Sequence, residues 1–154
     1  MANMKVTTVS RLKIKRFLFL MFAMYLVFLF YVTLFTHNYY EYGRSFNLVL
    51  FDSIHLMLNS GNSWLMIKNI LGNILLFFPL GFLVPCFVPT FRSFFKMVGT
   101  GMLISASIEF LQYMYANRIF DIDDILLNSL GTMVGYFVFL FFYGIVRLWN
   151  WFRR

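Results

Sequence analysis

The sequence predicts an all-α fold: a polytopic membrane protein with four transmembrane helices and an interfacial or re-entrant outer segment. Of the 154 residues, 61% are hydrophobic and 12% are charged, whereas soluble domains carry about 25% charged residues. Apolar runs long enough to cross a hydrocarbon core of about 30 Å recur along the chain. We expect one membrane domain, residues 17–148, between a cytoplasmic basic N-terminus, residues 1–16, and a cytoplasmic tail, residues 149–154.

The first predicted span, residues 17–35, contains no charged residue and follows a basic cluster. As a helix it is about 28 Å long, at 1.5 Å per residue, which matches the thickness of the bilayer core. The run is too long for a signal peptide, and the bulky residues that follow it offer no small-residue cleavage site. We therefore interpret it as an uncleaved membrane helix.

A long connection to the second span follows. Its tyrosines at positions 39, 40 and 42 suit a membrane interface, where the ring is buried and the hydroxyl stays in water. Its apolar part, residues 46–58, is too short to span and is interrupted by Asn47, Asp52 and His55. We expect this part to form a helix lying on the outer surface of the membrane.

The remaining predicted spans are residues 69–88, 94–116 and 125–148. Pro79 removes a backbone donor inside the second span, which predicts a kink there. Gly131 and Gly135 lie four residues apart in the fourth span and give it a flat face for close helix packing.

Lysine and arginine are distributed unequally between the two sides of this arrangement. Four spans place both termini on one side, together with ten of the 13 basic residues, and leave Arg44, Lys68 and Arg118 on the other. The positive-inside rule then predicts a multi-pass protein with both termini in the cytoplasm. The same rule accounts for the net charge of +7, so we do not expect nucleic acid as a partner.

Polar residues occupy one face of each of the last three spans. In the second span, Asn69 and Asn73 recur at the spacing of one helix face. Ser105, Glu109 and Gln112 do so in the third span, and Asp124 and Asn128 do so in the fourth. Lipid cannot satisfy such faces, so they turn inward. We predict a ligand-binding pocket near the outer leaflet, lined by Asn73, Glu109, Gln112, Arg118, Asp124 and Asn128.

Other interpretations of these polar residues remain open. The asparagines could serve only as hydrogen bonds between helices, Asp121 could cap the fourth helix, and Glu109 could be the buried partner of Arg118. The spacing of Asp121, Asp123 and Asp124 also resembles a clamp for a divalent cation, apart from which we expect no cofactor. No nucleophile motif or phosphate-binding loop appears, so we assign no catalytic residue.

Several stretches of the chain together resemble the VanZ-like family. They are NLVLF at 47–51, NILGNILLFFPLGF at 69–82, the glutamate and glutamine at 109 and 112, and RIFDIDDILLNSLGTMVG at 118–135. This family is named for resistance to the glycopeptide teicoplanin in Gram-positive bacteria. The resemblance therefore implies a protein of the bacterial cell membrane that acts at the cell envelope.

The resemblance and the predicted pocket lead to three functional hypotheses. The first is a protein that binds a membrane lipid, a lipid-linked cell-wall component or the lipoglycopeptide itself, and so lowers sensitivity to teicoplanin-type drugs. The second is a membrane-embedded, metal-dependent enzyme that acts on a phosphorylated lipid, with Glu109 as general base. The third is a small scaffold that modulates a larger membrane complex through its glycine faces.

Overall fold

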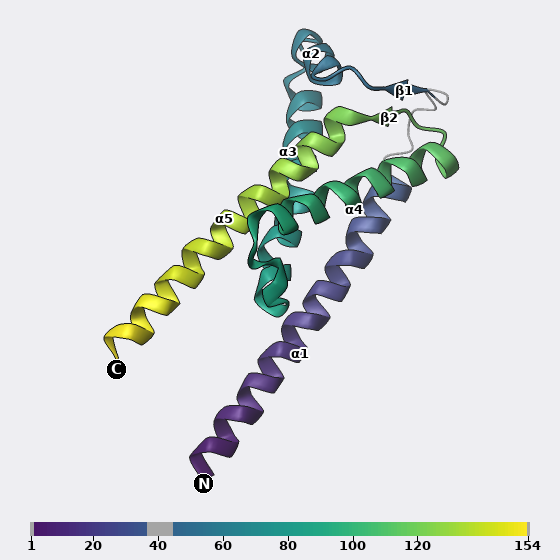
Figure 1. Cartoon of the computed structure of the whole chain (residues 1–154). Coiled ribbons are helices and arrows are strands. Elements are labelled where there is room, and N and C mark those ends of the chain that lie inside the picture. Colours follow the sequence, from purple (N-terminus) through teal and green to yellow (C-terminus); the bar gives the residue numbers. More distant parts are fainter. Residues whose placement is uncertain (1, 37–44, 154) are drawn as a thin grey trace.

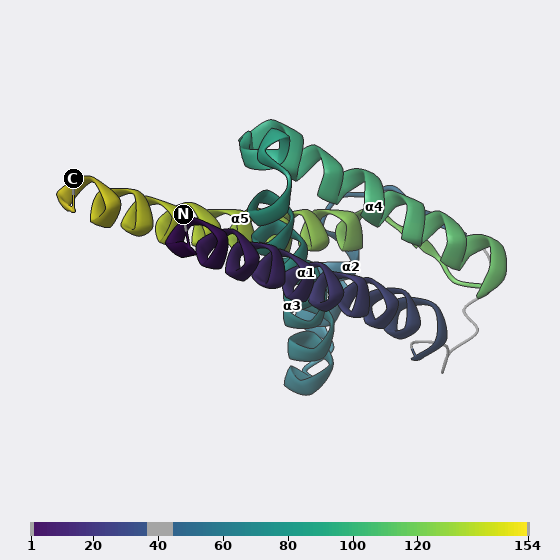
Figure 2. The ribbon, with the colours of Figure 1, turned by 90° about the horizontal axis from the view of Figure 1, so that it is seen from below.

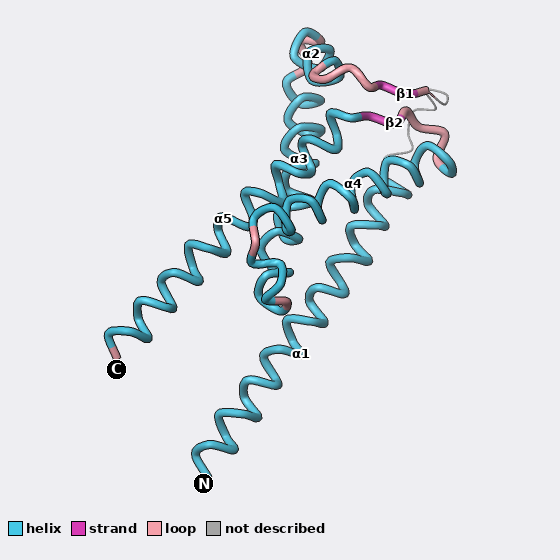
Figure 3. The backbone as a smooth tube through the Cα atoms, viewed as in Figure 1, coloured by secondary structure: helices cyan, strands magenta, loops and turns pink. Residues whose placement is uncertain are grey.

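The computed structural model describes residues 2–36 and 45–153, and nearly all of this part of the chain is helical (Figures 1 and 3). The helices are α1 (Ala2–Tyr31), α2 (Asp52–Asn59), α3 (Ser63–Phe87), α4 (Phe94–Tyr115) and α5 (Ile122–Phe152). A π-helical turn, Val32–Thr36, continues α1, and a 3-10 turn, Pro89–Arg92, joins α3 to α4. Two short strands, β1 (Phe46–Asn47) and β2 (Phe120–Asp121), complete the described elements.

Four of these helices are long and apolar enough to cross a membrane, which confirms the predicted fold class. The candidate spans are Arg16–Phe35, Met66–Phe87, Phe94–Tyr115 and Ile122–Phe152. Large apolar side chains lie on their outer surfaces; Phe19, Leu103 and Phe141, for example, are 63%, 71% and 64% exposed. Such surfaces are costly in water and favourable in lipid, so the four helices form a multi-pass membrane protein.

Both termini lie at the same end of the molecule, and α2 and the two strands lie at the opposite end (Figure 1). Seen along a perpendicular direction, α3 crosses the other long helices steeply (Figure 2), and both α3 and α4 pack against α5. We call the end that carries α2, β1 and β2 the loop end. The interfacial tyrosines predicted at positions 39, 40 and 42 lie outside the described residues.

The helices extend beyond the predicted spans. α1 begins at Ala2, so the polar start of the chain is helical, and α3 begins at Ser63 rather than at residue 69. α5 continues to Phe152, and α3 passes through Pro79 without interruption. Apolar runs mark the part of a helix that lipid surrounds, whereas backbone hydrogen bonding continues into flanking polar residues.

The outer segment differs from the single helix predicted for residues 46–58. It begins as β1, which pairs in parallel with β2 in the register Phe46 to Phe120 and Asn47 to Asp121. Only the part from Asp52 onward is helical, as α2. A strand of two residues has no periodicity of its own, so the pattern of apolar residues could not reveal this pairing.

Glycines allow α5 to pack directly against α3. A Cβ atom on Gly131 would overlap the carbonyl oxygen of Ile74, and one on Gly135 would overlap that of Phe78. From the other side, a Cβ atom on Gly81 would overlap the carbonyl oxygen of Thr132. The backbones of α3 and α5 therefore touch at Gly81, Gly131 and Gly135, and we call this contact the glycine seam. It fixes the position of the polar face of α3 relative to that of α5.

Candidate functional site

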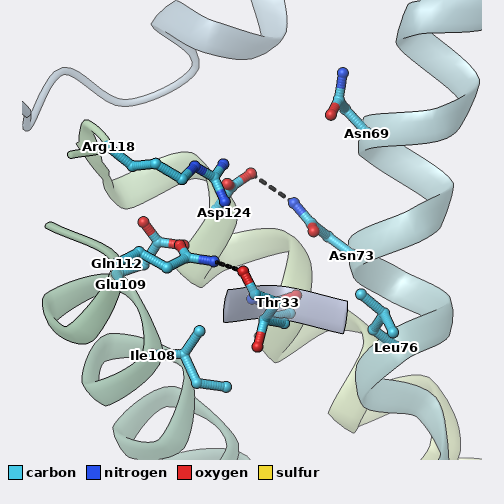
Figure 4. Close-up of a pocket in the computed structure, with 10 residues that line it drawn as sticks. Thr33, Asn69, Asn73, Leu76, Ile108, Glu109, Gln112, Arg118 and Asp124 are labelled. Carbon is cyan, nitrogen blue, oxygen red and sulfur yellow. Dashed lines mark hydrogen bonds between the residues drawn. The ribbon is translucent and has the colours of Figure 1, made fainter. Parts of the chain in front are cut away.

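A polar pocket lies between α3, α4, α5 and the end of α1 (Figure 4). All six residues predicted to form the pocket line it: Asn73, Glu109, Gln112, Arg118, Asp124 and Asn128. Thr33, Asn69, Leu76 and Ile108 complete the lining. The helical spacing of each polar face, together with the glycine seam, brings together the lining side chains of α3, α4 and α5, and Arg118 joins them from the connection between α4 and β2.

Amide side chains connect the helices around the pocket. Asn73 donates from Nδ2 to the Asp124 carboxylate at 2.5 Å, which joins α3 to α5 (Figure 4). Asn128 donates from Nδ2 to the hydroxyl oxygen of Ser105 at 2.8 Å, which joins α5 to α4. The interpretation of these asparagines as hydrogen bonds between helices therefore describes part of their role, since both also line the pocket.

The first membrane helix also contributes to the site, which the sequence did not indicate. Gln112 donates from Nε2 to the backbone carbonyl oxygen of Thr33 at 2.8 Å (Figure 4). Thr33 lies in the π-helical turn at the end of α1, where the backbone departs from regular α-helical hydrogen bonding. No spacing rule within a span could identify Thr33, because its contact is made by a backbone atom of a helix that shows no polar face.

Two carboxylates and one guanidinium form the charged part of the site. Glu109 is 3% exposed and accepts a hydrogen bond from the backbone N–H of Asp121 at 3.2 Å. The guanidinium of Arg118 lies beside Asp124 (Figure 4), and its charge acts on both Glu109 and Asp124. We call Glu109, Asp124 and Arg118 the charged triad; the direct pairing of Glu109 with Arg118 stays a prediction.

Two buried oxygen atoms in the pocket lining have no hydrogen-bond donor among the described residues. They are Oε1 of Gln112 and Oδ1 of Asn128, and the two side chains are 3% and 4% exposed. A buried acceptor without a donor costs free energy, commonly about 1–3 kcal/mol. Such atoms in a native structure indicate a bound water or ligand at that place.

The three aspartates of the predicted cation clamp have different partners. Asp121 caps α5 by accepting from the backbone N–H of Asp123 at 2.9 Å. It also accepts from the hydroxyl of Ser53 and from Nδ2 of Asn47, the latter at 3.4 Å. Asp124 faces Asn73 in the pocket.

Asp123 holds the start of α2. Its carboxylate is 1% exposed and accepts from the backbone N–H groups of Phe51, at 2.6 Å, and Ile54, at 3.3 Å. Phe51 has a φ of 66°, a conformation uncommon for a bulky residue, which the bond to Asp123 helps to maintain. Within residues 2–36 and 45–153, no group of three acidic, histidine or cysteine side chains could hold a metal ion. Cation binding by the three aspartates thus stays a prediction.

Asn47 and Ser53 are structural residues that the sequence reasoning did not identify. They lie in the outer segment and bind Asp121, about 70 positions further along the chain. The contact could be suspected only because NLVLF and the aspartate run both belong to the stretches on which the family resemblance rests.

The fold and the site define a class: a multi-pass helical membrane protein with a polar pocket between its spans. The model of the VanZ/LLP1 family matches residues 18–143, and the chain belongs to this family. Among curated proteins and among solved structures, no match to the chain was found.

Proposed function

We propose that this protein binds the polar head of an amphiphile, a membrane lipid or a lipid-linked cell-wall component, in the pocket between α3, α4 and α5. One observation carries the proposal. Acidic and amide side chains from three apolar helices, with Arg118 from the connection after α4, line one pocket, and two of their buried oxygen atoms have no protein donor among the described residues. Polar groups at such a position in a membrane protein are costly, and their presence there is typical of a ligand site or a transport path.

The biological consequence that we propose is reduced sensitivity of a bacterial cell to teicoplanin-type lipoglycopeptides. The chain belongs to the VanZ/LLP1 family, and the VanZ-like family that its sequence resembles is named for teicoplanin resistance. These drugs have an acyl chain and act on cell-wall precursors outside the membrane, so a protein that binds lipid heads in the outer leaflet would compete with them or alter their access. This proposal requires the loop end to face outward and the termini to face the cytoplasm.

The orientation can be tested with single cysteines in a variant in which Cys86 is replaced by alanine. Asn59 lies at the end of α2 and Lys96 lies in the first turn of α4, and both are exposed. An impermeant thiol reagent added to intact cells should label Asn59→Cys and should label Lys96→Cys only after permeabilisation. The reverse pattern would place the pocket in the inner leaflet and contradict the proposal.

The function can be tested by expressing the protein in a sensitive bacterium and measuring the minimal inhibitory concentration of teicoplanin. Gln112→Ala and Asp124→Asn remove polar groups from the pocket and should abolish any protection. Ser107→Ala is the matched control, because Ser107 is exposed on the same helix as Gln112 and bonds only to its own helix backbone, at Leu103. Protein levels in the membrane must be equal.

The same measurements separate the binding proposal from the scaffold hypothesis. The protein should change the minimal inhibitory concentration of a glycopeptide without an acyl chain only slightly, since the proposed competition involves the lipid. Full protection by both pocket variants would favour a scaffold that acts through its helix surfaces and would overturn the binding proposal.

A further inference from the structure

We infer that the pocket selects a primary ammonium group, such as the head of an aminophospholipid, rather than a phosphate. This inference rests on the proposed function and names the chemistry of the ligand. It follows from which hydrogen-bonding groups of the site are already engaged within the protein and which remain for a ligand.

The pocket lining carries two acidic side chains, Glu109 and Asp124, and one basic side chain, Arg118. The Arg118 guanidinium lies beside Asp124 (Figure 4). A phosphate entering this lining would meet two acidic side chains and a single guanidinium, whereas an ammonium group would meet oxygen acceptors.

The amide of Gln112 has a fixed orientation that leaves its oxygen atom without a donor. Its nitrogen donates to the backbone carbonyl of Thr33, and a carbonyl oxygen can only accept. The orientation of the amide is therefore fixed by chemistry, and Oε1 is the atom without a donor. This oxygen is buried with its residue, which is 3% exposed, in the lining of the pocket.

The amides of Asn73 and Asn128 likewise donate from their nitrogens to protein acceptors, namely Asp124 and Ser105. Oδ1 of Asn128, like Oε1 of Gln112, is buried and has no donor in the described part of the chain. The Ser105 hydroxyl can act as donor or acceptor, so the inference rests mainly on Oε1 of Gln112. Among the described residues, both buried side-chain atoms that lack a partner are acceptors, and a primary ammonium supplies three N–H donors with a positive charge.

The inference can be tested with a graded series of lipids on the purified full-length protein in detergent micelles. The series is dioleoyl phosphatidylethanolamine, its N-methyl and N,N-dimethyl derivatives, and dioleoyl phosphatidylcholine, which keep the phosphate and chains and lose N–H donors stepwise. Binding is measured by native mass spectrometry. We expect affinity to fall along the series, by about tenfold or more overall, as the loss of one or two charge-assisted hydrogen bonds implies.

Two further ligands complete the test. One separates the effect of positive charge from that of hydrogen-bond donation, and the other distinguishes a phospholipid amine from the amine of a cell-wall precursor. Dioleoyl phosphatidylglycerol keeps hydroxyl donors but has no positive charge, and it should bind at least about tenfold more weakly than phosphatidylethanolamine. A lysine-containing lipid-linked peptidoglycan precursor presents the same ammonium in another molecule. The molecule that binds more tightly, phosphatidylethanolamine or the lysine-containing precursor, is then identified as the source of the ammonium group.

Pocket variants connect the selectivity to this site. Asp124→Asn should reduce the preference for phosphatidylethanolamine over phosphatidylcholine, whereas Asp52→Asn, which changes an exposed carboxylate at the same end of the molecule, should keep it. The wild-type lipid series needs no variant and so remains decisive if Asp124→Asn fails to fold.

The outcomes separate the inference from the proposed function. Equal binding of all four zwitterionic lipids, or tighter binding of phosphatidylglycerol, would overturn the ammonium inference while leaving a lipid-binding protein. Absence of specific binding by every lipid and by the precursor would overturn both, and the unpaired oxygens would then be occupied by water.

Discussion

The substitution Asp123→Asn tests whether the aspartate run holds the outer segment or a cation. Asp123 accepts from two backbone N–H groups at the start of α2, from Phe51 at 2.6 Å and from Ile54 at 3.3 Å. Asparagine keeps one acceptor oxygen but presents an NH₂ group to the other donor. The lost hydrogen bond to a charged group costs about 1.5–3 kcal/mol, and the lost charge at the helix N-terminus costs about 0.3–1 kcal/mol.

The resulting loss of about 2–4 kcal/mol should be local, because the bonds of Asp123 to other segments reach only residues 51 and 54. Hydrogen–deuterium exchange reports local opening directly. Amides of residues 45–59 should exchange about 30-fold to 1,000-fold faster in Asp123→Asn, while the seam between α3 and α5 should be unchanged. Asp52→Asn is the matched control, since Asp52 lies in the first turn of the same helix but is exposed.

The result that would refute this reasoning is unchanged exchange of residues 45–59 in Asp123→Asn. A chelator supplies the complementary test. If the aspartates act through hydrogen bonds to the protein, a chelator should leave exchange in the wild type unaltered. If the chelator alone accelerates exchange of this segment, a bound cation holds it and the metal-dependent hypothesis gains its first support.

Two further predictions follow from the helix seam and from the charged triad. Gly135→Leu should destabilise the protein by at least about 3 kcal/mol, because the side chain would overlap backbone of α3, whereas Gly144→Leu should be nearly neutral, since nothing lies within 4 Å of its Cβ position. Reversible unfolding in mixed micelles measures both, and equal effects would contradict the close packing. Arg118→Gln should destabilise the protein more than Glu109→Gln, because it removes the one basic side chain from a lining with two acidic ones, while Glu109→Gln leaves the guanidinium beside Asp124. The double variant should regain stability relative to Arg118→Gln, and simple additivity of the two losses would argue against the triad.

Much of this protein could be predicted from composition and spacing because the bilayer imposes simple rules. Lipid requires long apolar helices, so the spans follow from the apolar runs. Exposure of polar groups to lipid is also energetically costly, so residues such as Glu109 and Asp124 must lie on the inner sides of their helices, facing one another. All six predicted pocket residues line one pocket for this reason.

The tertiary structure decided the features that depend on contacts between distant parts of the chain. The side-chain hydrogen bond from Asn47 to Asp121, the bond of Asp123 to the start of α2 and the contact of Gln112 with Thr33 each join residues more than 65 positions apart. Two of these contacts use a backbone atom as the partner. Because all residues share the same backbone carbonyl group and nearly all share the N–H group, the residue type does not predict such a contact. The sequence by itself therefore determined which side chains must meet, and the folded backbone decided which of their atoms are satisfied and which are left for a ligand.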